Sequence, residues 1–150
     1  GLRDPGAHRV EVDVGHAGQH CARIIEPLAF EAAFPEAAGA FVLAVGAAGN
    51  EPVAHAFFPA AYPEVLAGSA GTPGGFASYA NYGGFVDVAA PDASVVFWAN
   101  RQWYVVGTSS AAAFTTGVAA GLADKNGANW NAILQNIQQT FPVPATNKSK

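Results

Sequence analysis

The chain has 150 residues, 51% hydrophobic and only 12% charged, so it is long and apolar enough to bury the core of one domain. Its net charge of −4 offers no basic surface for nucleic acid, and no apolar run reaches membrane-spanning length. Its single cysteine, Cys21, excludes an internal disulfide. The chain starts at Gly1, lacks methionine and shows no signal-peptide pattern, so we expect an upstream segment to have been removed.

Short apolar runs bounded by glycine and proline predict strands. Residues 8–15 alternate around three valines, and residues 40–50 are continuously apolar and end in glycines. Residues 64–71 and 85–91 repeat the short apolar pattern. Further along, the runs "SVVFWAN" and "QWYVVG" predict a hairpin.

Three segments predict helices. Residues 15–39 are rich in Ala, Glu and Leu, and residues 110–122 place small side chains at helical spacing. Residues 129–141 predict an amphipathic helix that Asn129 caps. One face of this last helix is apolar and comprises Ile133, Leu134 and Ile137. Strands alternating with helices predict an α/β domain on a mostly parallel sheet.

In such sheets the chemistry lies at the carboxyl ends of the strands, and two segments qualify. In "VVGTSS", Ser109 lies in the first turn of a helix, near backbone N–H groups and the positive end of the helix dipole. In "GAAGN", the Asn50 amide ends a glycine turn and is able to donate to an oxyanion. The alternative interpretations are that Ser109 only caps the helix and that Asn50 is an ordinary turn residue.

Five segments, in order and with similar spacing, resemble motifs of the subtilisin-like serine proteases (subtilases, peptidase family S8). They are "GAHRVEVDVG", "AFVLAVGAAGN", "FFPAAYPEVLAGSAG", "FASYANYGGFVDVAAPDASVV" and "GTSSAAAFTTGVAAGL". The resemblance covers nearly the whole chain and matches the C-terminal half of the catalytic domain. It implies a three-layer α/β fold, with residues 1–141 as a partial catalytic domain and residues 142–150 as a polar tail.

The same resemblance implies a serine endopeptidase that hydrolyses peptide bonds through an acyl-enzyme. Ser109 matches the nucleophile and Asn50 the oxyanion-hole donor. The positions that match the substrate cleft are Asp13, Val14, Gly15, Ala48 and Gly49. Asp13 stands where the family usually has Ser, which either favours basic residues in a bound peptide or marks a cleft that is no longer used. The resemblance also favours a secreted or extracellular protein.

The subtilase triad runs Asp, His, Ser along the chain, and the matching segment begins after the first two. A second alignment makes Asp13 the triad Asp, but it puts Ala17 at the histidine position and leaves too few residues before Asn50. Neither alignment supplies the histidine base. Since a serine hydroxyl without a base is a weak nucleophile, we expect the isolated chain to be a poor or inert hydrolase.

The histidines of the chain do not replace that base. His16 and His20 have helical spacing for a metal pair, but no third ligand stands near them in a zinc-protease pattern. His55 follows Asn50 and is interpreted as a solvated loop residue. We therefore predict no metal and no cofactor.

Two hypotheses follow. The chain is part of an endopeptidase whose Asp and His come from another segment, or it is a catalytically inactive subtilase-like interaction or structural module. The second is motivated by the absent triad residues and by Ala113, where the family usually has Pro. Half of such a sheet leaves an open edge, so we expect a partner: the missing N-terminal half, another chain or a copy of itself. Nucleic acid and membrane are not expected partners.

Overall fold

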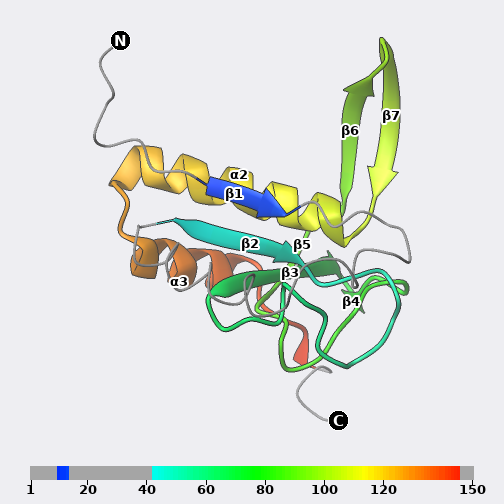
Figure 1. Cartoon of the computed structure of the whole chain (residues 1–150), viewed down its shortest axis with the longest axis horizontal. Coiled ribbons are helices and arrows are strands. Elements are labelled where there is room, and N and C mark those ends of the chain that lie inside the picture. The colour runs from blue at the N-terminus through cyan, green and yellow to red at the C-terminus, as the bar shows by residue number, and fades with distance from the viewer. Residues whose placement is uncertain (1–9, 14–41, 146–150) are drawn as a thin grey trace, which may run out of the picture.

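The structure is a computed structural model that describes residues 10–13 and 42–145 (Figure 1). Its elements in chain order are β1 (Val10–Asp13), β2 (Leu43–Ala47), β3 (Val65–Thr72), β4 (Gly75–Phe76), β5 (Val88–Ala90), β6 (Ala93–Trp98), β7 (Arg101–Val106), α2 (Thr108–Asn126) and α3 (Trp130–Thr140). The predicted helix over residues 15–39 lies outside the described residues.

The main sheet has five strands. β1, β2, β3 and β5 lie side by side and parallel, and β4 pairs antiparallel with the end of β3. The apolar runs thus form the predicted strands, although each strand is shorter than its run or shifted by a residue. A mostly parallel sheet with helices packed on it confirms the α/β class.

Both described helices contribute to one hydrophobic core with the sheet. Its buried residues are Leu43, Val45, Leu66, Val88, Ala112, Ala119, Ile133 and Ile137. Small side chains bring α2 close to the sheet: a Cβ added to Gly68 of β3 would lie 3.5 Å from the Cα of Ala112. Since little separates the two backbones, the helix start is fixed against the strands that precede it.

The boundaries of the helices differ partly from the expectation. α2 begins at Thr108 rather than Ser110 and continues four residues past Leu122, because its polar last turn stays helical on the surface until Gly127, whose φ is 74°. The N–H of Ala132 donates to the Asn129 side chain at 3.2 Å, which confirms the predicted cap of α3. Within residues 10–13 and 42–145, no helix is long and apolar enough to cross a bilayer.

The predicted hairpin is confirmed, and it extends away from the main sheet (Figure 1). β6 and β7 pair antiparallel, with Trp98 opposite Arg101. The two residues between them, Ala99 and Asn100, have φ of 49° and 59°. Two central residues with positive φ are the requirement of a type I′ turn, which matches the twist of the flanking strands.

Candidate active site

The loop after β2 and the start of α2 meet at Asn50. Its Oδ1 accepts hydrogen bonds from the backbone N–H of Thr108 at 3.0 Å and from the Thr108 hydroxyl at 3.1 Å. A backbone N–H only donates, so it fixes which end of the amide faces the helix. The Nδ2 end lies over Gly107, 3.5 Å from the position of a Cβ on that residue. An amide donor is therefore held beside the turn that carries Ser109.

Thr108 links the two segments through its hydroxyl, and it is 1% exposed. The N–H of Gly49 donates to Thr108 Oγ1 at 3.1 Å, while the same hydroxyl donates to Asn50 Oδ1. One buried side chain thus aligns two consecutive residues of the loop. Sequence reasoning assigned Thr108 no role, because its partners are 58 and 59 residues away.

Ser109 is the second residue of α2 and is half-buried. The N-cap position is Gly107, whose carbonyl accepts from the N–H groups of Ser110 and Ala111 at 3.0 and 3.2 Å. The interpretation of Ser109 as the helix cap is therefore wrong. Its place in the first turn puts it at the positive end of a 19-residue helix.

Asn81 also holds the Asn50 loop, through hydrogen bonds to the residues on either side of Asn50, and was missed by sequence reasoning. Its N–H donates to the Gly49 carbonyl at 2.9 Å, and its Oδ1 accepts from the N–H of Glu51 at 2.8 Å. The residue is fully buried, and the Ser69 hydroxyl donates to its carbonyl at 2.6 Å. Nothing in "FASYANYGG" marks this role, since the contacts depend on how the following loop returns to β2.

Gly49 has no room for a side chain next to Asn81. Its φ is +107°, and a Cβ there would lie 2.5 Å from Asn81 Nδ2. That Nδ2 atom is buried and has no hydrogen-bond partner among the described residues. A glycine is therefore required at this position both by conformation and by close approach.

The base of the hairpin is tied to the turn before Ser109. The Tyr79 hydroxyl donates to the Asp92 carboxylate, and the Asp92 carbonyl accepts from the N–H of Gly107 at 3.1 Å. Burial and the hydrogen bond to Asp92 raise the pKa of Tyr79 above its ordinary value. The entry and exit of the hairpin are held together one residue from α2.

The predicted substrate-binding positions are described only in part. Asp13 ends β1, while Val14 and Gly15 lie outside the described residues. Ala48 is fully buried, and its N–H donates to the Gly68 carbonyl at 2.9 Å. The role of each in substrate binding stays a prediction.

Of the four histidines, the structure describes only His55, which is exposed in the loop after Asn50. His8, His16 and His20 lie outside the described residues. Within the described ranges, no three His, Cys, Asp or Glu side chains group in a way that could hold a metal ion.

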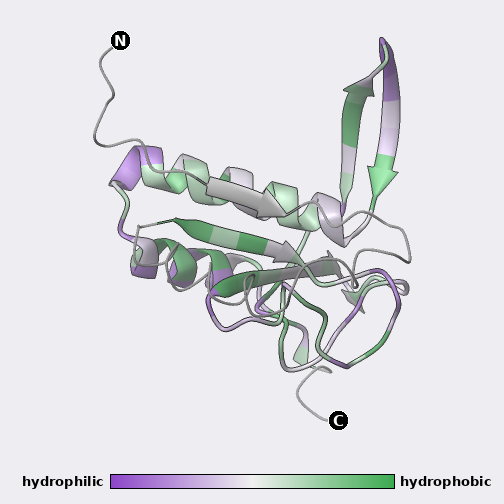
Figure 2. Cartoon of the chain, in the orientation of Figure 1, coloured by the Kyte–Doolittle hydropathy of each residue, from purple (hydrophilic) through white to green (hydrophobic). Residues whose placement is uncertain are grey.

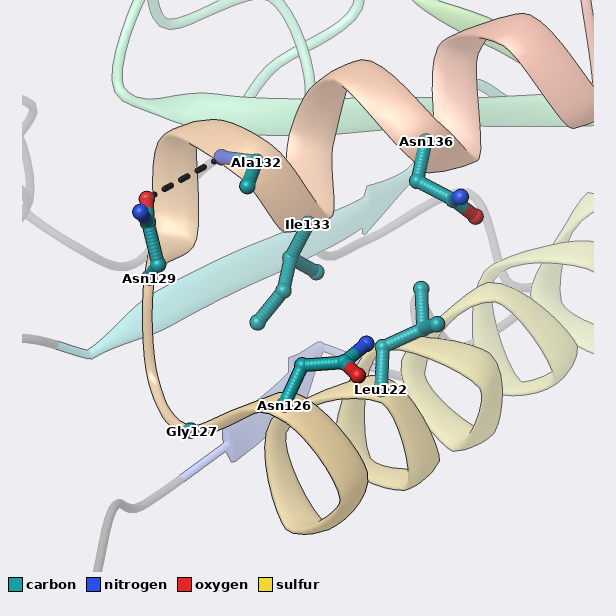
Figure 3. Close-up of a pocket in the computed structure, with 7 residues that line it drawn as sticks. All are labelled: Leu122, Asn126, Gly127, Asn129, Ala132, Ile133 and Asn136. Carbon is teal, nitrogen blue, oxygen red and sulfur yellow. Dashed lines mark hydrogen bonds between the residues drawn. The ribbon is translucent and has the colours of Figure 1, made fainter.

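A pocket of about 280 Å³ lies between the end of α2 and the start of α3 (Figure 3). Its lining comprises Leu122, Asn126, Gly127, Asn129, Ala132, Ile133 and Asn136. At the helical rise per residue, Leu122 is about 20 Å along α2 from Ser109. This pocket is therefore separate from the place where Asn50 meets the start of α2.

Comparisons with known proteins identify relatives over part of the chain. No family model matches. A thermophilic serine proteinase from Bacillus sp. (strain AK1) is 42% identical over 99 residues, which are 64% of this chain and 24% of that protein. Halolysin from Haloferax mediterranei is 45% identical over 85 residues, 54% of this chain and 16% of the relative. The chain thus spans less than a third of either curated relative.

Solved structures give the same result for the fold. A cold-adapted subtilisin-like serine proteinase superposes with a TM-score of 0.67 at 25% identity, covering 77% of this chain and 44% of that one. The prenylagaramide maturation protease PagA superposes with a TM-score of 0.59 at 29% identity, covering 65% and 38%. In each case more than half of the solved chain has no counterpart here.

Proposed function

We propose, from the premise that this chain belongs to the subtilisin-like serine protease family, that it carries the nucleophile and the oxyanion-hole amide of an endopeptidase. Ser109 is the nucleophile and Asn50 the donor. The observation that supports this assignment is the pair of hydrogen bonds from Thr108 to Asn50 Oδ1, which hold the amide of Asn50 beside the first turn of α2.

In the proposed reaction the Ser109 hydroxyl attacks the carbonyl carbon of a peptide bond and its proton goes to a base. The carbonyl oxygen becomes negatively charged, and Asn50 Nδ2 and the N-terminal end of α2 stabilise it. The amine then leaves with a proton, and water hydrolyses the acyl-enzyme. Donors that are already oriented need no rearrangement as the charge develops. The hydrogen bonds of Thr108 and Asn81 to the Asn50 loop supply this orientation in the proposed reaction.

The base and the acid that orients it belong, in this proposal, to a separate segment. The family's triad order puts Asp and His before the matched region, and a base must come within hydrogen-bond reach of the hydroxyl, roughly 3 Å. The proposal also includes a three-layer arrangement of the domain. It further includes a substrate cleft, whose residues are Asp13, Val14, Gly15, Ala48 and Gly49.

A fluorophosphonate probe, which reacts with activated serines, tests the proposal. The chain is treated with the probe alone and after addition of the Asp- and His-bearing segment of the thermophilic serine proteinase. We expect Ser109 to be labelled only in the mixture and Ser109→Ala to abolish labelling. Asn50→Ala is expected to slow labelling while sedimentation still detects the complex. A complex that forms without labelling Ser109 would contradict the proposal.

The second candidate is an inactive subtilase-like module, favoured by one observation. Ala113 occupies the position where the family usually has Pro, and α2 continues regularly through it. The same labelling experiment separates the two candidates, because an inactive module binds the segment and leaves Ser109 unmodified.

A further inference from the structure

The joint between α2 and α3 contains an Asn-Gly pair. Asn126 is the last residue of α2, and Gly127 follows it with a φ of 74°. Every other asparagine of the sequence precedes a residue that has a side chain. Both residues of the pair are exposed, and Figure 2 shows the hydrophilic colour at this end of α2 and in the link to α3. A Cβ built on Gly127 would meet no atom of the described residues within 4 Å, so the backbone of the pair is accessible.

An accessible Asn-Gly pair is able to react with itself. The backbone nitrogen of Gly127 attacks Cγ of Asn126, and a new N–C bond closes a succinimide ring. The side-chain nitrogen of Asn126 leaves as ammonia and takes the proton that the Gly127 nitrogen loses. Water then opens the ring at either carbonyl and gives aspartate or isoaspartate. Because the two reacting groups are neighbours in the chain and glycine has no Cβ to obstruct the approach, the reaction needs only water.

The position of Asn126 at the end of its helix allows this ring to close in the folded protein. A helical backbone keeps the next nitrogen out of reach of Cγ, so the helix must first open locally. The last turn of a helix frays at low cost in free energy, whereas an interior turn opens only with its surroundings. Asn136 is exposed like Asn126, but it lies inside α3 and precedes the fully buried Ile137. The fold therefore permits the reaction at Asn126 and opposes it at Asn136.

The reaction would introduce a charge at the edge of the hydrophobic core. Asn126 lines the pocket between the two helices, and none of the side chains that line this pocket is charged. Figure 3 shows the Asn126 amide directed into the space between the helices, where Leu122 and Ile133 lie. Ile133 is 3% exposed and belongs to the core that both helices share with the sheet. A carboxylate at Asn126 would lie beside these apolar groups and at the negative end of the dipole of α2.

We propose that Asn126 is a site of spontaneous deamidation, and that its conversion to aspartate or isoaspartate weakens the packing of α3 against α2. Isoaspartate acts in a second way, because it lengthens the main chain between the two helices by one carbon. Asparagine is among the residues that heat damages chemically, and this asparagine combines the most reactive sequence neighbour with the most accessible place in its helix. The inference requires no protease activity and is independent of the proposed function.

Mass spectrometry of the full chain, kept in mildly alkaline buffer, tests the site. Cleavage after Lys125 releases a peptide that contains both Asn126 and Asn136, and fragmentation of that peptide assigns the change. We expect Asn126 to gain one mass unit with time and to become a substrate of protein isoaspartyl methyltransferase, while Asn136 stays unmodified. Asn126→Gln is the matched variant, because a glutamine must form a larger ring and reacts far more slowly. Reaction of Asn136 as fast as Asn126, or reaction of Asn126 only after unfolding in urea, overturns the site.

Two charge substitutions test the effect on packing. Asn126→Asp imitates the charge of the product, and Gln135→Glu adds the same charge at an exposed position in the middle of α3. Both positions are exposed, so both variants are expected to fold. We expect Asn126→Asp to raise the equilibrium constant of unfolding by about two- to five-fold, and Gln135→Glu to leave it unchanged.

The aged protein completes the test by urea unfolding. The aged wild-type chain should lose at least as much stability as Asn126→Asp, because isoaspartate also changes the main chain. The Asn126→Gln variant, aged in the same way, should keep its stability. A chain converted at Asn126 that unfolds at the same urea concentration as before, or an Asn126→Asp variant that behaves like Gln135→Glu, refutes the effect on packing.

Discussion

β3 and β6 are both short apolar strands, but their surroundings are opposite. Six consecutive residues of β3, Val65–Ala70, are buried, because β2 and β5 flank the strand and α2 packs on it. In β6 four of the six residues from Ala93 to Trp98 are large and apolar, and five of the six are exposed. The comparison shows that an apolar run specifies a strand without specifying what covers it. In β3 the cover is within the described chain, and in β6 it is not.

The largest expected effect comes from truncating the core that β3 helps to form. Ile137 is fully buried, so Ile137→Ala should lower the free energy of unfolding by about 3 kcal/mol, since it leaves a cavity. Phe97→Ala removes a larger side chain from the exposed hairpin and should change it by less than about 0.5 kcal/mol. Urea unfolding of the free chain measures both. Similar losses for the two variants would mean that the hairpin is already covered.

Thr108 tests whether the edge of the sheet that carries Asn50 and Ser109 behaves like the buried region. Thr108→Val leaves the Gly49 N–H without its acceptor and should cost about 2 kcal/mol. Thr115→Val is the matched control: Thr115 is also buried, but its hydroxyl donates only to the Ala111 carbonyl within the helix. We expect the control to cost less than half as much by urea unfolding. Equal costs would show that the Thr108 bridge adds nothing beyond burial.

Asp87 adds a pH dependence to the buried region. Burial raises its pKa, and the hydrogen bond from the Ala67 N–H at 2.8 Å opposes that shift. Because the folded state then binds its proton more tightly than the unfolded chain, this group makes the protein less stable as pH rises above about 4 through the raised pKa.

Asp87→Asn keeps an oxygen acceptor for Ala67 and cannot ionise. We expect this variant to lose less stability than the wild-type chain between pH 4 and 7, a smaller effect than that of Thr108→Val. Thermal melts across this range measure it. The interpretation is refuted if the wild-type chain gains stability with rising pH in this interval and the variant does not, because Asp87 would then contribute with the opposite sign.

The smallest effect is expected in the turn of the hairpin. Ala99 has φ of 49°, a conformation that costs an L-residue with a Cβ about 1 kcal/mol. Asn tolerates this conformation better, so Ala99→Asn should slow hydrogen exchange of the β6 and β7 amides by about two- to five-fold. Ala99→Val should accelerate it. The exchange of β3 amides should not change in either variant, which keeps the two regions distinct.

The sequence predicted the elements well where local pattern decides them. Alternation and continuous apolar runs located the strands other than the two-residue β4, and the Asn129 cap together with the apolar face of the helix located α3. The start of α2 was misplaced by two residues because Gly107 is extended, with φ of 159°, and lets the helix begin at Thr108. The C-terminal end of α2 was missed as well, because Lys125 and Asn126 are exposed and polar and so add nothing to the apolar pattern that predicts a helix.

The candidate site was predictable only in part. Ser109 and Asn50 stand in motifs, but Thr108 and Asn81 act through residues that are 30 to 59 positions away along the chain. Such contacts depend on the order of strands in the sheet, which local periodicity does not encode. The exposure of the hairpin could not be predicted from the sequence either, because a buried apolar strand and an exposed one have the same composition.

The Thr108 hydroxyl has a consequence for how the site tolerates change elsewhere. Its bond to Asn50 Oδ1 and the bond from the Thr108 backbone N–H to the same oxygen set the spacing between the Asn50 amide and the start of α2, although the two residues are 58 positions apart along the chain. A change of length confined to the hairpin tip, which lies outside these contacts, is therefore expected to leave the Asn50 amide and Ser109 aligned.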